Sequence, residues 1–224
     1  LGYRNITNVT NERTMVPTVL PRNCSDYTVR LIIGDKIKGL FCLFLAGNLA
    51  SISFDYFARQ SVAGTNFSDY IMKQLPIIPP THYTLTDLHY ITPRMLELTC
   101  TAWDVHPFAD DVWYEADPDL REGLLGQWQE NTIATGGGHH GVARPDWVGP
   151  QPEGGFPHPP FKWEESRRAV LCAELDAYSA RLYGLNRKQL RYILDPADLT
   201  PAELEDILSP YEEVRNPLDP QGYA

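Results

Sequence analysis

The chain has 224 residues and a formal net charge of −10, with 43% hydrophobic and 21% charged residues. This is the composition of an ordinary globular protein, and it excludes fibrous and wholly disordered classes. The longest apolar run, residues 40–54, is interrupted by Gly47, Asn48 and two serines. Because a membrane-spanning helix needs about 20 apolar residues, no membrane partner is expected.

Charge is distributed unevenly along the chain. Residues 1–75 hold eight basic and five acidic residues, whereas residues 76–224 hold eleven basic and twenty-four acidic residues. A polyanion such as nucleic acid would therefore meet the first third. The four cysteines lack the close spacing of zinc or redox motifs, and no secretion signal is present. These features predict a reduced, cytoplasmic protein.

The hydrophobic pattern predicts an α+β fold. Residues 1–33 are expected to form strands and turns, because apolar side chains from Tyr27 to Ile33 recur at every second position. Residues 37–52 have apolar positions three and four apart, which predicts a helix with a bend at Gly47. A shorter helix is expected over residues 66–74.

The next two segments are punctuated by proline. The sequence LPIIPP at residues 75–80 must be extended, because proline disfavours a helix at its own position and at the one before. A second long helix is then expected over residues 93–101. Thr92 is a suitable N-cap for it, and Pro93 suits the first helical position.

Residues 103–162 have a different composition, with nine glycines, eight prolines and ten acidic against three basic residues. Such a segment is typical of a linker or loop. Helices are expected again over residues 163–183, 186–193 and 200–208. We therefore expect an α+β region over 1–102, a Gly/Pro-rich acidic linker or loop over 103–162, and a C-terminal helical region over 163–224.

Motifs for catalysis are not found in the sequence. It has no glycine-rich phosphate loop and no Gly-x-Ser-x-Gly elbow. His139 and His140 follow three glycines, and Asp104, Asp110 and Asp111 form an acidic group. We interpret both groups as exposed loop residues, with a stand-alone hydrolase that uses histidine and aspartate as a rival hypothesis.

Two polar stretches in the basic third, within residues 4–14 and 59–73, are typical of nucleic-acid contacts. Arg, Asn and Gln side chains can read base edges, and Ser and Thr can reach phosphates. The composition alone favours an ordinary polar surface over nucleic-acid contacts, and both interpretations stay open at this point. The candidate DNA-binding residues are Asn11, Arg13, Arg59, Gln60, Thr65, Asn66 and Lys73.

Four sequence blocks, in order, resemble the C-terminal target-recognition region of large bacterial adenine-specific DNA methyltransferases. These are the type IIG-like restriction–modification enzymes and their relatives in phage-defence systems. The blocks cover most of the chain outside residues 105–160 and the last thirty. They contain RNIT and NERTMV within residues 4–21, FDYFARQ and MKQLPIIPP within 53–80, PRMLELT within 93–104, and FKWEE within 161–195.

The resemblance implies a module that reads double-stranded DNA for a methyltransferase catalytic domain, supplied in cis or in trans. The cofactor S-adenosylmethionine is expected in that domain, because neither the Asn-Pro-Pro-Tyr motif nor the cofactor loop of the family occurs in this sequence. No catalytic residue, cofactor site or metal site is therefore assigned to this chain, and it is not expected to be active alone. The alternative is a non-catalytic protein–protein interaction module of a defence complex, with the acidic C-terminal part as its working surface.

Overall fold

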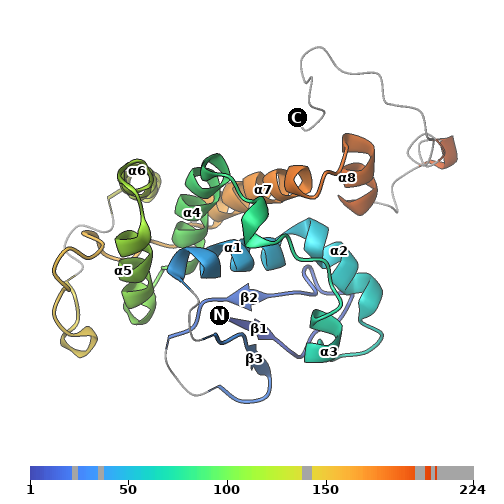
Figure 1. Cartoon of the computed structure of the whole chain (residues 1–224), viewed down its shortest axis with the longest axis horizontal. Coiled ribbons are helices and arrows are strands. Elements are labelled where there is room, and N and C mark those ends of the chain that lie inside the picture. The colour runs from blue at the N-terminus through green and yellow to red at the C-terminus, as the bar shows by residue number, and fades with distance from the viewer. Residues whose placement is uncertain (22–24, 35–37, 138–142, 195–199, 203–204, 206–224) are drawn as a thin grey trace, which may run out of the picture.

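The computed structural model describes residues 1–21, 25–34, 38–137, 143–194, 200–202 and 205. Within them, a small antiparallel sheet lies beneath a larger helical layer, which confirms the predicted α+β class (Figure 1). The strands are β1 (Gly2–Arg4), β2 (Pro17–Thr18) and β3 (Val29–Leu31), in the order β2-β1-β3. Tyr3 pairs with Pro17 and Arg30, and its side chain is buried beneath the helices.

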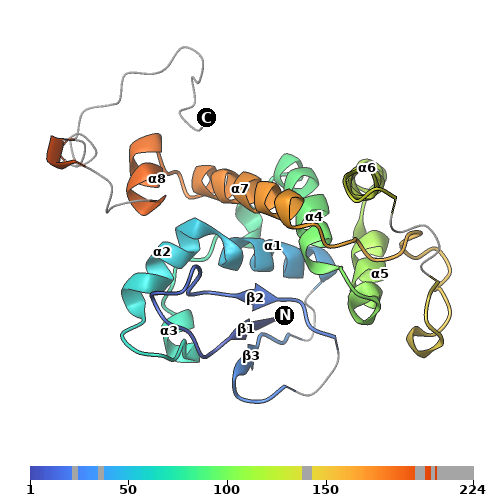
Figure 2. The ribbon, with the colours of Figure 1, turned by 180° about the vertical axis from the view of Figure 1, so that it is seen from behind.

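Helices α1 (Gly39–Ala50) and α2 (Ile52–Ser61) cover one face of this sheet (Figure 2). The chain bends by 61° between them. The bend lies at Ser51 rather than at Gly47, because Ser51 has an extended backbone and its hydroxyl accepts a hydrogen bond from Phe54 N, the N-cap arrangement. Over the described residues, no single helix has the length and apolar character of a membrane span, and only α1 and α2 taken together across the bend reach both.

The expected helix start at Pro93 is wrong, because α4 (Leu85–Thr99) begins eight residues earlier. Thr84 and Asp87 form a reciprocal capping box at its start, which satisfies two backbone N–H groups. Pro93 lies inside the helix. Short elements flank α4. The helix α3 (Asp69–Met72) and the 3-10 turn η1 (Pro80–His82) precede it, and the 3-10 turn η2 (Trp103–Val105) follows it.

The linker expected over residues 103–162 is wrong for its first half, which forms α5 (His106–Glu115) and α6 (Pro118–Ala134). Pro107 and Pro118 stand in the first turns of these helices, where proline needs no N–H partner. The average composition concealed this, because most of the glycines and prolines come after Ala134. Both helices bury apolar residues in the main core: Ala109, Val112, Leu120, Leu124 and Trp128.

The rest of the chain returns across the same core. Residues 143–162 have only one 3-10 turn, η3 (Asp146–Val148), but they bury Phe156 and Phe161. Helices α7 (Glu165–Leu182) and α8 (Arg187–Leu194) follow, close to the expected bounds. Most of the helix expected over residues 200–208, together with His139 and His140, lies outside the described residues. The main core joins residues from all three expected parts of the chain.

Candidate nucleic-acid interface

The two polar stretches identified in the sequence lie side by side in the fold. Ile6 forms an isolated antiparallel bridge with Asn66. Thr7 N donates to Thr65 O at 2.9 Å, and Phe67 N donates to Asn5 O at 2.7 Å. These bonds hold the connection from β1 to β2 against the segment that follows α2. We call residues 8–12 and 61–66 the paired loops.

Arg59 fixes the shape of the first paired loop from within. Its Nη1 donates to Val9 O at 2.9 Å, and its Nη2 donates to Asn11 O at 2.8 Å and also to Glu12 O. Its Nε donates to an Asp55 carboxylate oxygen at 2.7 Å. The guanidinium is thus used for internal contacts, and this geometry favours a role in positioning the loop.

Asp55 lies beneath this arrangement, with 1% of its side chain exposed. Its second carboxylate oxygen accepts hydrogen bonds from Thr14 N and Met15 N, each at 2.7 Å. A buried carboxylate requires such partners, because its charge is costly to remove from water. Asp55 and Arg59 together connect α2 to the start of the strand segment that leads into β2.

Arg13 is likewise engaged inside the fold. Its Nη2 lies 2.5 Å from an Asp176 carboxylate oxygen on α7, and the other oxygen of that carboxylate accepts from Ile52 N at 2.7 Å. Burial raises the pKa of the Asp176 carboxyl, and the Arg13 charge opposes that shift. Arg13, the residue after the first paired loop, therefore joins this part of the chain to α7 and to the start of α2.

The remaining candidate residues lie nearer the solvent. The Asn11 side-chain amide is half-buried and lies 3.0 Å from Arg4 Nη2. Lys73 follows α3 at the same end of the molecule as the paired loops (Figure 1). Of the seven candidates, the structure leaves four exposed: Gln60, Thr65, Asn66 and Lys73.

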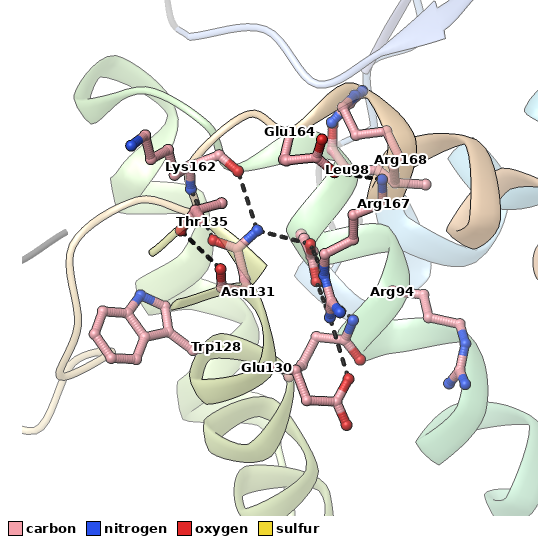
Figure 3. Close-up of polar contacts among 12 residues, drawn as sticks. Arg94, Leu98, Trp128, Glu130, Asn131, Thr135, Lys162, Glu164, Arg167 and Arg168 are labelled. Atoms are coloured by element: carbon pink, nitrogen blue, oxygen red, sulfur yellow. Dashed lines mark hydrogen bonds and ion pairs between the residues drawn. The ribbon is translucent and has the colours of Figure 1, made fainter. Parts of the chain in front are cut away.

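A second ionic network joins α4, α6 and α7 (Figure 3). Glu97, with 2% of its side chain exposed, accepts two hydrogen bonds from Arg167, at 2.6 and 2.9 Å. Gln127 and Asn131 on α6 donate to the same carboxylate at 2.6 and 2.8 Å. Protein groups bind both carboxylate oxygens, and Glu97 is buried. The network therefore has a structural role, which is to hold three helices together.

The rival hypothesis of a histidine–aspartate hydrolase concerns one buried pair, and the expectation of an exposed loop is wrong for its Asp110, which is buried on α5. His106 Nδ1 lies 3.6 Å from Asp110 Oδ2, and His106 Nε2 is 2.8 Å from the carbonyl of His158. The His106 side chain is fully buried, so no substrate reaches it. Within the part of the chain that the structure describes, no group of three His, Cys, Asp or Glu side chains could hold a metal ion.

One basic element was not predicted from the sequence. Helix α8 carries Arg187 and Arg191, both exposed, and it packs on α2 (Figures 1 and 2). The excess of acidic over basic residues, counted over 76–224 as a whole, concealed this basic helix, although residues 177–194 contain no Asp or Glu. A shorter window for counting charge would have found it.

Comparison with known proteins gives no match. No protein-family profile fits the sequence, and no curated protein or solved structure is significantly similar to it.

Proposed function

We propose that this chain is the DNA target-recognition part of an adenine-specific DNA methyltransferase of a restriction–modification or phage-defence system, acting in the cytoplasm. Its partners are double-stranded DNA and the methyltransferase catalytic domain, in cis or in trans. The catalytic residues and the S-adenosylmethionine site belong to that domain.

One observation carries the proposal: ion pairs and hydrogen bonds join the four sequence blocks that resemble the methyltransferase family. Arg13 of the first block pairs with Asp176 of the fourth, and Arg59 of the second holds carbonyls of the first. Glu97 of the third pairs with Arg167 of the fourth. The residues that carry the resemblance therefore make one connected unit of the fold.

The paired loops are the best-suited surface for reading DNA. They present short polar side chains, including Asn8, Thr10, Thr65 and Asn66, on a backbone that Arg59 and Asp55 hold in place. A rigid backbone lowers the entropy cost of binding. Asn and Gln amides make bidentate contacts with adenine edges.

The test measures binding of the whole chain to fluorescent duplex DNA. A pool of 30-base-pair duplexes with a randomised centre is titrated across 50–200 mM salt, and bound members are enriched over several rounds. We expect affinity to fall with salt and a short motif to emerge. The Asn66→Ala variant should weaken that preference, whereas Gln129→Ala, at an exposed position on α6, should not. Failure of the unaltered chain to bind any duplex at 50 mM salt would overturn the proposal.

The alternative, a protein–protein interaction module of a defence complex, is favoured by the outer face of the sheet. Tyr3 points toward the helices, so Leu31, which pairs with the neighbouring Gly2, points the opposite way and is 47% exposed. Tyr27 and Ile33, which flank β3, are 69% and 81% exposed. Retention of DNA binding by a Leu31→Lys, Ile33→Lys variant, with loss of a co-purifying partner, would show that this face serves a protein contact.

A further inference from the structure

Arg4 is an exposed arginine that contacts the first paired loop directly. It is the last residue of β1, and its Nη2 lies 3.0 Å from the Asn11 side-chain amide. Within the described residues, Arg4 forms no ion pair with a carboxylate. It therefore differs from Arg13 and Arg59, each of which is paired with an aspartate.

The acidic side chains that border the sheet have partners of their own. Asp69 lies 3.8 Å from Arg30 Nε, and Asp26 accepts hydrogen bonds within its own turn. Glu12, the acidic residue of the first paired loop, acts on α7. Burial is the main cause that raises the pKa of the Cys172 thiol there, and the Glu12 carboxylate adds to it. The positive charge at the end of β1 is therefore available to an external anion.

Strand pairing places Asn66 beside Arg4. Ile6, which forms the antiparallel bridge with Asn66, lies two positions after Arg4. Because side chains alternate along an extended chain, and because opposed residues of a bridge share one face, all three point to the same side. All three are exposed, whereas Tyr3 points the other way, toward the helices. A diagonal neighbour in such a pair lies roughly 7–8 Å away, within reach of a long side chain.

Among the asparagines of the paired loops, Asn66 has its amide open to a ligand. The Asn8 side-chain oxygen accepts from Thr10 N at 3.0 Å, and the Asn11 amide contacts Arg4. Within the described part of the chain, the Asn66 side chain makes no hydrogen bond. A free amide of this kind can donate to and accept from an adenine edge at the same time.

We infer that Arg4 binds a backbone phosphate of the DNA duplex next to a base pair that Asn66 reads. This inference rests on the proposed function and assigns two separate roles within it. Arginine suits phosphate because its planar guanidinium donates two parallel hydrogen bonds. The contact with Asn11 holds the Arg4 side chain in place, which lowers the entropy cost of binding. A protein partner is the rival ligand, because Leu31 shares this face, but the polar paired loops favour DNA.

The test compares Arg4→Gln and Asn66→Ala in the whole chain, with the random-centre duplex pool described above as the probe. Loss of one phosphate contact by Arg4→Gln should reduce the slope of log affinity against log salt by about one. The same relation gives a loss of affinity of up to roughly 8-fold at 0.1 M salt for all sequences. Asn66→Ala should instead keep the slope and lose roughly 5- to 150-fold in affinity on the selected motif alone. Arg4→Lys should restore most of the slope, because a phosphate contact responds mainly to charge.

The control is Lys38→Gln, which makes the same change of net charge at an exposed position before α1. The next residue, Gly39, donates its N–H to Glu115 of α5, and all of α1 and α2 separates it from the second paired loop. This variant should leave the salt slope unchanged. Circular dichroism of each variant checks that the helices remain folded.

The possible failures are distinguishable. If the unaltered chain binds duplex and Arg4→Gln leaves the salt slope unchanged, the inference is wrong while the proposed function stands. The same conclusion follows if Arg4→Gln weakens binding to one motif only, or if it releases a co-purifying protein and leaves DNA binding intact. If the unaltered chain binds no duplex at 50 mM salt, both the inference and the proposed function are wrong.

Discussion

At the scale of single residues, the arginines expected to contact DNA have other roles. A guanidinium has five N–H donors, and a loop with unpaired carbonyls can use all of them. Arg59 uses its donors on Asp55 and on carbonyls of residues 9–12, and Arg13 binds Asp176 on α7. Both side chains therefore hold the chain between β1 and β2 against α2 and α7.

Replacement of Arg59 by alanine should reduce the free energy of unfolding. Asp55, with 1% of its side chain exposed, would lose its cation and keep its two backbone N–H donors. Removing one partner of a buried ion pair costs roughly 3–5 kcal/mol, and the retained donors place the expected loss near the lower end. Urea unfolding measures the change. Gln60→Ala, at the next and exposed position, should alter stability by less than about 0.5 kcal/mol. Equal stability of the two variants would contradict the positioning role.

At the scale of elements, single polar contacts fix how the helices lie against one another. The Tyr178 hydroxyl on α7 donates to Asp87 on α4 at 2.6 Å. Burial acts to raise the pKa of Asp87, but hydrogen bonds from Tyr178 and Thr84 outweigh it and lower the pKa below its ordinary value. Burial and the neighbouring Asp87 raise the pKa of Tyr178 to about 12, so its hydroxyl stays protonated and able to donate at neutral pH.

This pair predicts a pH dependence of stability. Because the pKa of Asp87 is lower in the folded chain, its stabilisation is present above the ordinary aspartate pKa and is lost as the pH falls through the folded value. Tyr178→Phe should reduce stability at pH 7 by roughly 1.5–3 kcal/mol, and the difference from the unaltered chain should shrink in acid. Thermal melts from pH 7 to pH 3 measure both effects. Tyr70→Phe, at a site 76% exposed, is the control. A difference that grows in acid would refute the assignment.

At the scale of the whole molecule, one core joins α1, α4, α5, α6 and α7, and a second core lies between the sheet and α2. The segment with the composition of a linker supplies a large part of it, including Trp128, whose ring stacks on His158 with centroids 4.0 Å apart. Elements that share one core unfold together in a small domain. The helices that share the main core should therefore unfold as a single cooperative unit.

Trp128→Ala should destabilise α1 as well as its own helix. Truncation of a buried tryptophan costs roughly 3–5 kcal/mol, and the shared core transmits that cost. Amide hydrogen exchange should quicken in α1 and α6 by similar factors under native conditions. Ile133→Ala, on the same helix but 80% exposed, should change neither. Loss of protection in α6 alone would show that the two helices unfold independently.

The sequence by itself determined the features that depend on neighbouring residues. Apolar spacing gave the helices over 37–52 and 163–183 to within a few residues, and alternation gave the strand at Val29–Leu31, because local periodicity decides which face of an element is buried. The candidate residues Thr65 and Asn66 lie on an exposed loop, as their polarity indicates, whereas Gln60, expected in the same loop, lies in the last turn of α2.

Only the tertiary structure decided which partners distant residues meet. Arg13 and Asp176 are 163 positions apart, and no local pattern relates them, so an arginine expected to contact DNA became an internal link. The segment 106–134 forms helices because its apolar side packs against α1 and α4. Composition alone does not show the stabilisation that this packing provides. The basic helix α8 lies beside α2 for the same reason. Contacts between distant segments depend on how whole helices and strands pack against one another, and local sequence patterns do not determine that packing.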